Sequence, residues 1–527
     1  MKIQLVVPMS GIGKRFKDAG YTIPKPLIKV RGKEIINHVV NMFEKIERVI
    51  FICNEEHLND KNLNIRKILK NLHPKTTIIS IKPHKKGPIH AVLEAESILD
   101  SLTPTIVNYC DFNSLFDFPN FINHIKKDKP DGCVFTYTGF HPHMLKNTNY
   151  AYVKKDKNSV IDIQEKKPYT EKPMLEEVSS GTYYFKSAQI MLKYFKKTTL
   201  LDLKVNGEFY VSIAYKPMIK DGLKIKTFLI DYFMQWGTPS DLEDFNWYSN
   251  VFNSINNKSF NHKNIYEGSL LMPMAGEGSR FREKGYKTPK PFIKISGSEM
   301  YFKAIKDLPR MESIKIVTRE DLIKNKKTSL NIKNKKLNIS IKSLNTKTDG
   351  QARTALEAIE DKNINLEKPL LISACDMGVV FDEKKYQNLL SAKDIDILVW
   401  GCKGYPGAQQ NPQMYSWIYE SENYISKISV KKNLINPRED YVLIGTFTFK
   451  KANDFLRSAE LSIASGEKVN GEYYVDSVIN KSIEIGLKVA VFEVDYFICW
   501  GTPDELETYN YWESCFKEWK DHTYKKI

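Results

Sequence analysis

The sequence predicts an α/β protein of two tandem domains, each a mostly parallel sheet flanked by helices. In each half, apolar runs of strand length alternate with segments whose apolar residues recur at helical spacing, which is the pattern of βαβ units. In addition, the motif Pro8–Phe16, closed by Pro24–Pro26, returns as Pro273–Phe281, closed by Pro289–Pro291. The copies keep the same internal spacing at a distance of 265 residues, so the chain contains an internal duplication.

The first half opens with alternating strands and helices. We expect strands at Ile3–Val7, Arg48–Cys53, Thr76–Ile81 and Thr103–Cys110, and helices at Glu34–Phe43 and Gly87–Ala95. This order gives a mostly parallel, Rossmann-like sheet, which binds ligands at the carboxyl ends of its strands. Both the glycine turn after the first strand and Asp111 after the fourth would lie on that edge.

The remainder of the first half is richer in strands. We expect a helix around Phe209–Lys216 and a closing helix that begins at the turn Trp236-Gly-Thr-Pro239. The expected strands are Gly132–Tyr137, Tyr150–Val153, Val160–Glu165, Ser180–Phe185 and Ile225–Asp231. These additional strands would supply the wall for a second substrate.

The second half repeats the landmarks of the first in the same order. The matching segments are Cys375-Asp376 with Cys110-Asp111, Gly350 with Gly87, Asn470-Gly-Glu472 with Asn206-Gly-Glu208, and Trp500-Gly-Thr-Pro503 with Trp236-Gly-Thr-Pro239. A stretch rich in Asn, Ser and Lys lies between the halves and is typical of a linker. We therefore expect domain 1 at 1–252, the linker at 253–267 and domain 2 at 268–527.

Composition restricts the class of protein. The 527 residues are 42% hydrophobic and 27% charged, as in globular proteins. The seven cysteines form no CxxC pair, which argues against a disulfide framework or a structural zinc site. With no apolar run of roughly 20 residues and no signal sequence, we expect a cytoplasmic protein without a membrane partner. The net charge of +16 suits anionic ligands. Lysine runs such as Ile323–Lys327 and Ile332–Lys336 lack aromatics, which favours solvated surface over a nucleic-acid site.

The repeated motif has the parts of a phosphate cradle. Gly11 and Gly13 follow a buried strand, and glycines there let backbone N–H groups approach a phosphate closely. Arg15 adds a planar fork of donors, and Lys25, between two prolines, adds a point charge. These groups suit a nucleoside triphosphate. A structural strand-to-helix turn with two solvated cations is the alternative, and the repetition of the motif disfavours it.

Asp111 adds a carboxylate at the end of a strand near the cradle. A carboxylate so placed beside phosphates is a natural Mg²⁺ ligand, and a helix N-cap is the alternative role.

Together, the glycine turn with Arg and Lys-Pro, the aspartate after the fourth strand and the late Gly-Thr-Pro resemble the sugar-phosphate nucleotidyltransferase superfamily. Within it, the branch that includes bacterial cytidylyltransferases acting on phosphorylated sugars and alcohols is the most similar. The resemblance covers nearly the full length of both halves. It implies transfer of a nucleoside monophosphate from a Mg²⁺-bound triphosphate, with CTP preferred, to a small phosphorylated acceptor, with release of pyrophosphate, for surface-polysaccharide precursors.

The resemblance also implies a role for each motif residue. Gly87 and Gly350 would lie close to the base, Asp111 and Asp376 would hold Mg²⁺, and Glu165 with Lys166 would meet the acceptor phosphate. The residues that would bind and activate the triphosphate are Gly11, Gly13, Arg15 and Lys25 in the first half and Gly276, Gly278, Arg280 and Lys290 in the second.

The metal site departs from the family's pattern. Many members carry a second metal-binding aspartate two residues before the late glycine, where this chain has Gln235 and Cys499. Asp231 and Asp495, at the end of the preceding strand, are candidate replacements, with a turn or helix-cap role equally open.

The acceptor pair differs between the halves. Where the first half has Glu165-Lys166, the second has lost the glutamate, and Lys431 and Lys432 are its acceptor candidates. Two active sites with different acceptors, or one active half beside a silent scaffold or regulatory half, are both open. A nucleotide-sugar-dependent glycosyltransferase and a non-catalytic nucleotide sensor or nucleic-acid-binding protein are the competing classes.

Overall fold

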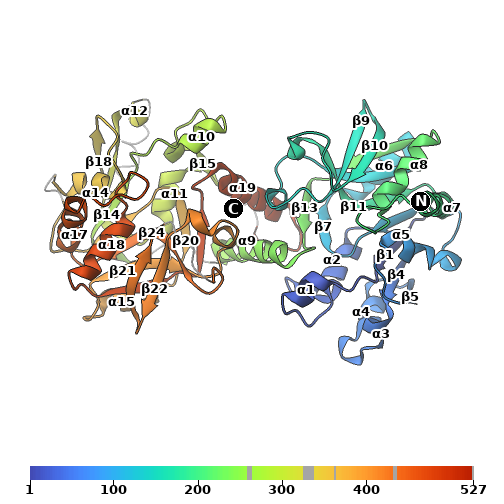
Figure 1. Ribbon diagram of the computed structural model, residues 1–527, viewed down its shortest axis with the longest axis horizontal. Coiled ribbons are helices and arrows are strands. Elements are labelled where there is room, and N and C mark those ends of the chain that lie inside the picture. Colours follow the sequence, from blue (N-terminus) through green and yellow to red (C-terminus); the bar gives the residue numbers. More distant parts are fainter. Residues whose placement is uncertain (258–263, 325–337, 361–363, 431–435, 525–527) are drawn as a thin grey trace. The chain divides into compact units, whose positions relative to one another are not determined.

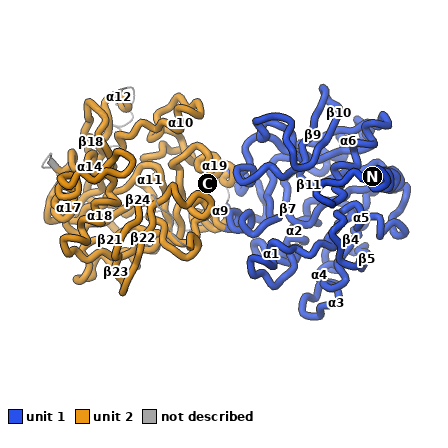
Figure 2. The backbone as a smooth tube through the Cα atoms, in the orientation of Figure 1, with its two compact units in different colours: residues 1–246, 514–527 blue, residues 247–513 orange. Residues whose placement is uncertain are grey.

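The structure, a computed structural model, describes residues 1–257, 264–324, 338–360, 364–430 and 436–524. The chain divides into two compact units: unit 1 comprises residues 1–246 with 514–527, and unit 2 comprises residues 247–513 (Figure 2). Each unit is an α/β body with its own sheet and its own hydrophobic core.

Unit 1 contains a nine-stranded sheet (Figure 1). Its strands are β1 (Gln4–Met9), β4 (Arg48–Asn54), β5 (Thr76–Ile81), β6 (Thr105–Asn108), β8 (Gly132–Tyr137), β9 (Ala151–Asp156), β10 (Ser159–Glu165), β11 (Glu177–Phe185) and β12 (Ile225–Leu229). The order is β10-β9-β11-β6-β1-β4-β5, with β8 on β11 and β12 on β8. Strands β6, β1, β4 and β5 are parallel, whereas β11 is antiparallel to β6, β8 and β9. The parallel half therefore forms the Rossmann-like part of the unit.

Short ribbons and helices complete unit 1. The ribbons are β2 (Lys29–Val30) with β3 (Lys33–Glu34), and β7 (Phe112–Leu115) with β13 (Tyr232–Gln235). The helices are α1 (Lys14–Asp18), α2 (Ile35–Asn41), α3 (Glu55–Asn59), α4 (Ile65–Leu72), α5 (Pro88–Leu93), α6 (Phe118–Asp128), α7 (Ala188–Leu200), α8 (Tyr215–Lys220) and the start of α9 (Pro239–Asn257). Helix α5 packs on β1 and α7, and α7 packs on α8.

The apolar runs become the buried centre of the sheet. All six residues of β1 are buried, and Leu5, Val6 and Val7 have no exposed surface. Strands covered by helices on both faces read as continuous hydrophobic runs, because neither face meets water. This burial fixes the register of β1 between β4 and β6, and so fixes where the glycine turn leaves the sheet.

Unit 2 repeats the strand order of unit 1. Its strands are β14 (Ile265–Pro273), β17 (Arg310–Arg319), β18 (Ile339–Leu344), β19 (Leu370–Ser373), β21 (Ile397–Cys402), β22 (Trp417–Ser421), β23 (Tyr424–Ser429), β24 (Tyr441–Phe449) and β25 (Val489–Glu493). The order β18-β17-β14-β19-β24-β21-β25 corresponds to β5-β4-β1-β6-β11-β8-β12. The fold class predicted from the sequence, two tandem Rossmann-like α/β domains, is confirmed.

The smaller elements of unit 2 match as well. Its ribbons are β15 (Lys294–Ile295) with β16 (Ser298–Glu299), and β20 (Met377–Val380) with β26 (Tyr496–Cys499). Its helices include α10 (Ser279–Glu283), α11 (Met300–Asp307), α12 (Glu320–Ile323), α14 (Gln351–Glu360), α15 (Glu383–Ser391), α16 (Pro406–Gln410), α17 (Ala452–Ala464), α18 (Val475–Glu484) and α19 (Pro503–Glu518).

The compact units differ from the sequence-based domain bounds in two places. The expected linker, 253–267, begins inside α9 and ends inside β14, with 258–263 outside the described residues. The last residues, 514–527, belong to unit 1, whereas the sequence assigned them to domain 2. The repeat shows where similar sequence begins and ends, but the compact units follow from packing. The ring centroid of Trp519 lies 5.5 Å from that of His38 and 6.3 Å from that of Trp236, so the end of the described chain packs in unit 1.

Two predicted segments are shifted. The expected helix at Phe209–Lys216 is a 3₁₀ turn at Val211–Ala214 followed by α8, which continues to Lys220. The lysine run Ile332–Lys336 lies outside the described residues. In the described part of the chain, no helix combines the length and hydropathy that a membrane-spanning segment requires.

Candidate active site

The glycine turn leaves the carboxyl end of β1 and enters α1. Gly13 adopts a φ of 67°, in the left-handed region that favours glycine, and caps the helix by accepting hydrogen bonds from the N–H groups of Phe16 and Lys17. A Cβ atom added at Gly11 would meet no atom within 4 Å. The backbone of the turn is therefore open on this side, as a phosphate cradle requires.

Lys25 and Asp111 meet beside this turn. Lys25 starts a 3₁₀ turn, Lys25–Leu27, and its Nζ lies 2.8 Å from Oδ2 of Asp111. Burial opposes the charge on Lys25, but the Asp111 carboxylate outweighs it and holds the pKa of Lys25 above its ordinary value. The lysine is therefore charged at neutral pH. Prolines 24 and 26 hold the backbone on both sides of it.

A pocket of about 220 Å³ connects these groups. Its lining combines the glycine turn, the Lys25–Asp111 pair and a facing wall that comes from the loop before α5 and the segment before α8. The lining residues are Pro8, Met9, Ser10, Gly11, Ile12, Gly13, Lys25, Pro26, His57, His84, Gly87, Pro88, Tyr109, Cys110, Asp111, Glu208 and Tyr210. This is the carboxyl edge of the parallel strands, where the sequence predicted the ligand.

Arg15 extends from α1 and is exposed, and it does not line the pocket. Its positive charge acts on the pKa values of Lys25, Tyr150 and Tyr210, so the guanidinium lies near the pocket mouth. The side chain forms no hydrogen bond or ion pair with any described residue. Its donors are therefore available to an anionic ligand.

Unit 2 contains the same arrangement. Lys290 forms an ion pair with Asp376 and donates to the carbonyl of Gly501 at 3.1 Å, and Gly278 has a φ of 61°. The pocket has a volume of about 240 Å³. Its lining residues are Pro273, Met274, Ala275, Gly276, Gly278, Lys290, Pro291, Lys347, Thr348, Gly350, Gln351, Thr354, Ala374, Cys375, Asp376 and Glu472. Arg280 is exposed like Arg15, and its charge acts on Tyr474.

Gly87 and Gly350 line the two pockets, and each has a packing reason to be glycine. A Cβ atom at Gly87, where φ is 88°, would lie 2.6 Å from the backbone nitrogen of Phe209. At Gly350 it would lie 2.3 Å from the carbonyl oxygen of Tyr473. Close backbone approach therefore explains both glycines, and their place beside a base stays a prediction.

The walls opposite the phosphate groups differ between the units. Unit 1 presents His84, Pro88 and Tyr109, and at the matching positions unit 2 presents Lys347, Gln351 and Ala374. The first wall offers an imidazole, a proline ring and a phenol, whereas the second offers an ammonium, an amide and a methyl group. The glycine turn, the lysine and the aspartate are the same in both units, whereas these three wall positions differ.

The acceptor pair of unit 1 lies beside the pocket. Glu165 ends β10 and accepts a hydrogen bond from Ser212 at 2.5 Å, and burial raises its pKa. Lys166 donates to the hydroxyl of Tyr210 at 2.6 Å. In unit 2, Lys431 and Lys432 lie outside the described residues.

The sequence reasoning assigned no role to Glu208 and Tyr210. The Tyr210 hydroxyl donates to Glu208, and both residues line the pocket. Glu472 lines the unit 2 pocket, and Tyr474 follows it at the same spacing. The repeated Asn-Gly-Glu was the available signal: its two copies were recognised as landmarks of the repeat, but not as parts of a site.

The replacement metal ligands predicted from the sequence lie apart from Asp111 and Asp376. In the β7–β13 ribbon Gln235 pairs with Phe112, beside Asp111, whereas Tyr232 pairs with Leu115 at the far end, and Asp231 lies one residue beyond it. Asp495 precedes Tyr496, which likewise pairs with Val380 at the far end of the β20–β26 ribbon. The ribbon register separates Asp231 from Asp111 and Asp495 from Asp376, and the role of Asp231 and Asp495 as metal ligands stays a prediction.

In each unit one carboxylate lies beside the glycine turn, where it suits Mg²⁺. Among the described residues, no group of three or more His, Cys, Asp and Glu has the geometry of a metal site. Mg²⁺ commonly uses one or two carboxylates, with substrate phosphates and waters completing its shell. Asp111 and Asp376, each beside a glycine turn, suit this mode of binding.

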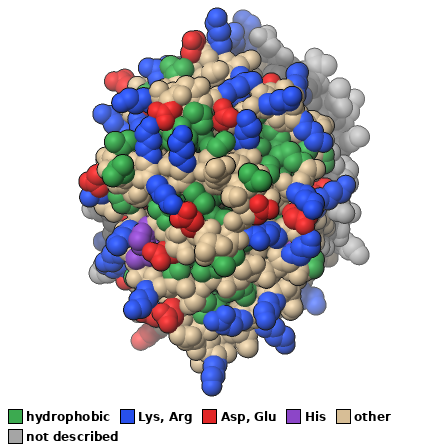
Figure 3. Space-filling view, turned by 90° about the vertical axis from the view of Figure 1, so that its right-hand side faces the viewer, with side chains coloured by type: hydrophobic (Ala, Val, Ile, Leu, Met, Phe, Trp, Pro, Cys, Tyr) green, Lys and Arg blue, Asp and Glu red, His purple; other side chains and the backbone are tan. Residues whose placement is uncertain are grey.

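Charge on the surface is mixed. On the face in Figure 3, Lys and Arg side chains are spread among Asp and Glu and are not gathered into one stripe. The positive charge is therefore dispersed on this face.

Comparisons with known proteins concern about half of the chain. Residues 6–246 match the family model described as Nucleotidyl transferase. Bifunctional protein GlmU of Clostridium tetani is 26% identical over 245 residues, which cover 44% of this chain and 49% of that protein. GlmU of Clostridioides difficile is 26% identical over 240 residues, covering 43% and 47%. The chain thus spans about half the length of the curated relatives that it matches.

Solved structures give similar coverage. A nucleoside-diphosphate-sugar pyrophosphorylase from Vibrio cholerae RC9 has 24% identity and a TM-score of 0.38, covering 46% of this chain and 98% of that one. An inositol-1-phosphate CTP transferase from T. maritima has 17% identity and a TM-score of 0.37, covering 48% and 97%. The family match and the curated relatives support the predicted class of enzyme, a nucleotidyltransferase. The nucleotide, the acceptor and the role of the second half belong to the proposal below.

Proposed function

We propose that each unit transfers a nucleoside monophosphate from a Mg²⁺-bound nucleoside triphosphate to a small phosphorylated acceptor, with release of pyrophosphate. One observation carries the proposal: an open glycine turn beside a contact between a lysine and an aspartate occurs in both units, as Lys25 with Asp111 and as Lys290 with Asp376. The family match over residues 6–246 supports it for unit 1, and the same strand order and pocket lining support it for unit 2.

The reaction is an in-line displacement at the α-phosphorus. An oxygen of the acceptor phosphate forms a bond to that phosphorus, the bond to the bridging oxygen breaks, and pyrophosphate leaves. The protein's task is to hold two anions in line and to offset their repulsion. The backbone of the glycine turn and Lys25 would bind the phosphates, and Arg15, with no described partner, would reach them from the pocket mouth.

Asp111 and Asp376 would hold Mg²⁺. When bound, the ion would neutralise the triphosphate oxygens and the charge on departing pyrophosphate. Glu165, Lys166 and Tyr210 lie beside the unit 1 pocket and would orient the acceptor. Because the nucleoside-facing walls differ, we propose different substrates for the two units, with a cytoplasmic role in making surface-polysaccharide precursors and CTP as the preferred donor.

Pyrophosphate release tests this proposal. The protein is supplied with Mg²⁺, each of CTP, UTP, GTP, ATP and dTTP, and a panel of sugar and polyol phosphates. We expect acceptor-dependent pyrophosphate, with Lys25→Ala and Lys290→Ala each removing part of the activity. A single variant that abolished all activity on every acceptor would rule out two independent sites. Absence of pyrophosphate, with turnover of a nucleotide sugar instead, would support a glycosyltransferase.

A further inference from the structure

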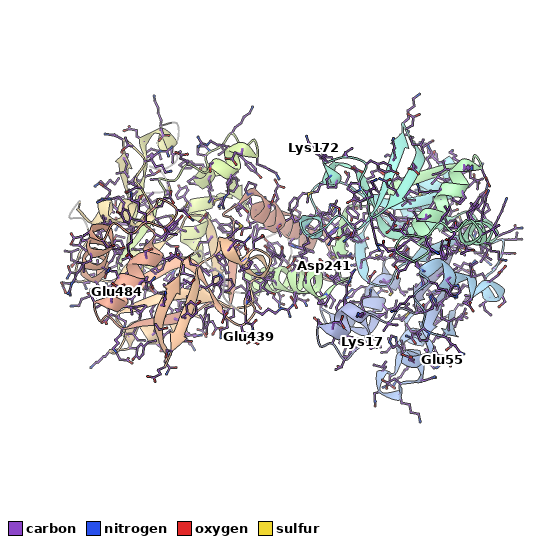
Figure 4. All side chains as sticks on the ribbon, viewed as in Figure 1. Lys17, Glu55, Lys172, Asp241, Glu439 and Glu484 are labelled. Atoms are coloured by element: carbon purple, nitrogen blue, oxygen red, sulfur yellow. The ribbon has the colours of Figure 1, made fainter. Side chains whose placement is uncertain are left out.

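The first turn of the helix after each Gly-Thr-Pro carries a carboxylate. In unit 1 it is Asp241 of α9, labelled in Figure 4. In unit 2 the first turn of α19 holds Asp504 and Glu505, and Glu505 is the one that corresponds to Asp241. The two residues occupy matching positions of the repeat, five residues after Trp236 and Trp500. Their surroundings differ in charge.

Asp241 is neutralised by a lysine. Its Oδ1 lies 3.1 Å from Nζ of Lys146, and its Oδ2 accepts a hydrogen bond from Thr238 at 2.6 Å. Lys146 also pairs with Asp244 at 2.6 Å. Both oxygens of Asp241 are therefore occupied within its own cluster.

Glu505 has hydroxyl partners and no cationic one. It accepts hydrogen bonds from Thr502, at 2.9 Å, and from the Tyr415 hydroxyl. The matching positions for Lys146 and Asp244 hold Asn411 and Thr508. Across the residues that the structure describes, no lysine or arginine lies within 4 Å of the Glu505 carboxylate. Both oxygens of Glu505 thus accept hydrogen bonds, as those of Asp241 have partners, but the donors to Glu505 are neutral hydroxyls and no described lysine or arginine neutralises it.

Glu505 also reaches toward the aspartate of the site. A Cβ atom added at Gly501 would lie 3.2 Å from Sγ of Cys499, 3.4 Å from Oδ2 of Asp376 and 3.5 Å from Oε2 of Glu505. The two carboxylate oxygens are thus at most about 7 Å apart. A Mg²⁺ ion on Asp376 would reach Glu505 through a bound water at the upper end of this range, and directly where the two oxygens lie within about 4 Å of each other. In unit 1 the nearest atoms to the same point on Gly237 are Oδ2 of Asp111 and the amide of Gln235.

We propose that Glu505 is the second carboxylate ligand of the divalent cation in unit 2, acting from the helix in place of a carboxylate at Cys499 on the strand. This inference rests on the proposed function, since it concerns the metal of the same site. Unit 2 would then present two carboxylates to the metal where unit 1 presents one. The two sites would hold divalent cations with different affinities.

Binding of Mn²⁺ alone to the full chain tests the proposal, with free Mn²⁺ followed by electron paramagnetic resonance. We expect Glu505→Gln, which keeps the size and hydrogen-bonding capacity of the side chain, to weaken the tighter class of site by about tenfold or more. The matched unit 1 variant, Asp241→Asn, should leave Mn²⁺ binding unchanged. Thermal unfolding of each variant shows whether the fold is intact.

A double variant distinguishes the loss of a metal ligand from damage to the fold. Sγ of Cys499 and Oε2 of Glu505 both lie near the Cβ position of Gly501, at 3.2 Å and 3.5 Å from it, so Cys499→Asp combined with Glu505→Gln should recover the tighter Mn²⁺ site. Mn²⁺ binding by Glu505→Gln equal to that of the unaltered protein would overturn the inference, as would a folded double variant without recovery. If Glu505→Gln binds both Mn²⁺ and nucleoside triphosphates as the unaltered protein does, the role of Glu505 is wrong and the proposed function is unaffected. If unit 2 of the unaltered protein binds no nucleotide, the proposed function is wrong for that unit.

Discussion

At the scale of the residue, the two lysine–aspartate contacts could be predicted only in part. The repeat identified Lys25 and Asp111 as site residues, because their spacing and neighbours recur. Their contact could not be read from the sequence, because 86 positions separate them and the sheet brings them together. The same limit applies to Asp231: its place at the end of a strand was readable, but the ribbon register that moves it away from Asp111 was not.

Two histidines of unit 1 should make its stability fall in mild acid. His141 and His143 are buried, and burial lowers the pKa of His141 to about 4 and that of His143 well below its ordinary value. The unfolded chain takes up these protons near pH 6.5, so it binds more protons than the folded protein as the pH falls below that value. The free energy of unfolding therefore decreases as pH falls from about 6.5 toward 4.

Urea unfolding at pH 7 and pH 5 measures this effect. For His141 alone, the loss between the two values should be about 2 kcal/mol, from the depressed pKa. In His141→Asn, whose amide can replace the ring nitrogen that faces the Gly139 carbonyl, the pH dependence should be smaller by that amount. An unchanged pH dependence in this variant would show that other groups control acid stability.

At the scale of the element, a substitution in the turn between β1 and α1 should change ligand binding without changing stability. Gly11 has room for a methyl group, since nothing lies within 4 Å of an added Cβ atom, and it lines the pocket. Gly11→Ala should therefore keep its unfolding temperature and lose nucleotide affinity, because the methyl group occupies the side from which a phosphate approaches. Calorimetric titration with Mg²⁺-nucleotide, together with thermal unfolding, measures both properties.

Gly87→Ala is the contrasting variant. Its φ of 88° and the 2.6 Å approach to Phe209 make an added Cβ atom both strained and obstructed. We expect a loss of stability of more than about 1 kcal/mol, from the backbone conformation alone. If Gly11→Ala proved the less stable of the two, the turn would be structural, and the cradle interpretation would lose its support.

The elements themselves were predictable to different degrees. The apolar strand β4 follows its expected bounds closely, because burial on both faces leaves a clear signal. Strand β5, at the edge of the sheet, is mostly half-buried, and its β-branched residues still mark its bounds. The ribbons β7–β13 and β20–β26 were not predicted, because each strand has only four residues and pairs with one distant in sequence. These ribbons set the separation of Asp231 from Asp111 and of Asp495 from Asp376, so the sequence could not show that the members of each pair lie apart.

At the scale of the whole molecule, the repeat correctly indicated two α/β bodies, but not which residues complete each one. Residues 514–527 belong to unit 1, although they follow the second copy of the motif. Trp519 is 5% exposed, and its ring lies near those of His38, Trp236 and Phe245. Asp521 pairs with Lys33 at 3.0 Å. Sequence periodicity carries no information on such contacts, because they join the two ends of the chain.

Trp519→Ala should therefore destabilise unit 1, where its ring packs. Removing a buried tryptophan ring costs about 3–5 kcal/mol. Hydrogen exchange should accelerate in α2 and β13, which carry or adjoin its neighbours, while the strands of unit 2 remain protected. Trp512→Ala, a buried tryptophan of unit 2 stacked on Tyr248, is the matched control and should give the opposite pattern. Faster exchange throughout both units in each variant would contradict this assignment.

The central claim is that each unit contains its own triphosphate site. The most direct test is calorimetric titration of the full chain with each of the five Mg²⁺-nucleoside triphosphates, repeated on Lys25→Glu and Lys290→Glu, which reverse the charge beside each glycine turn. The account predicts two sites in the unaltered protein, for one or two nucleotides, with one site removed by each substitution. A single site removed by one substitution alone, or no binding of any triphosphate, would contradict it.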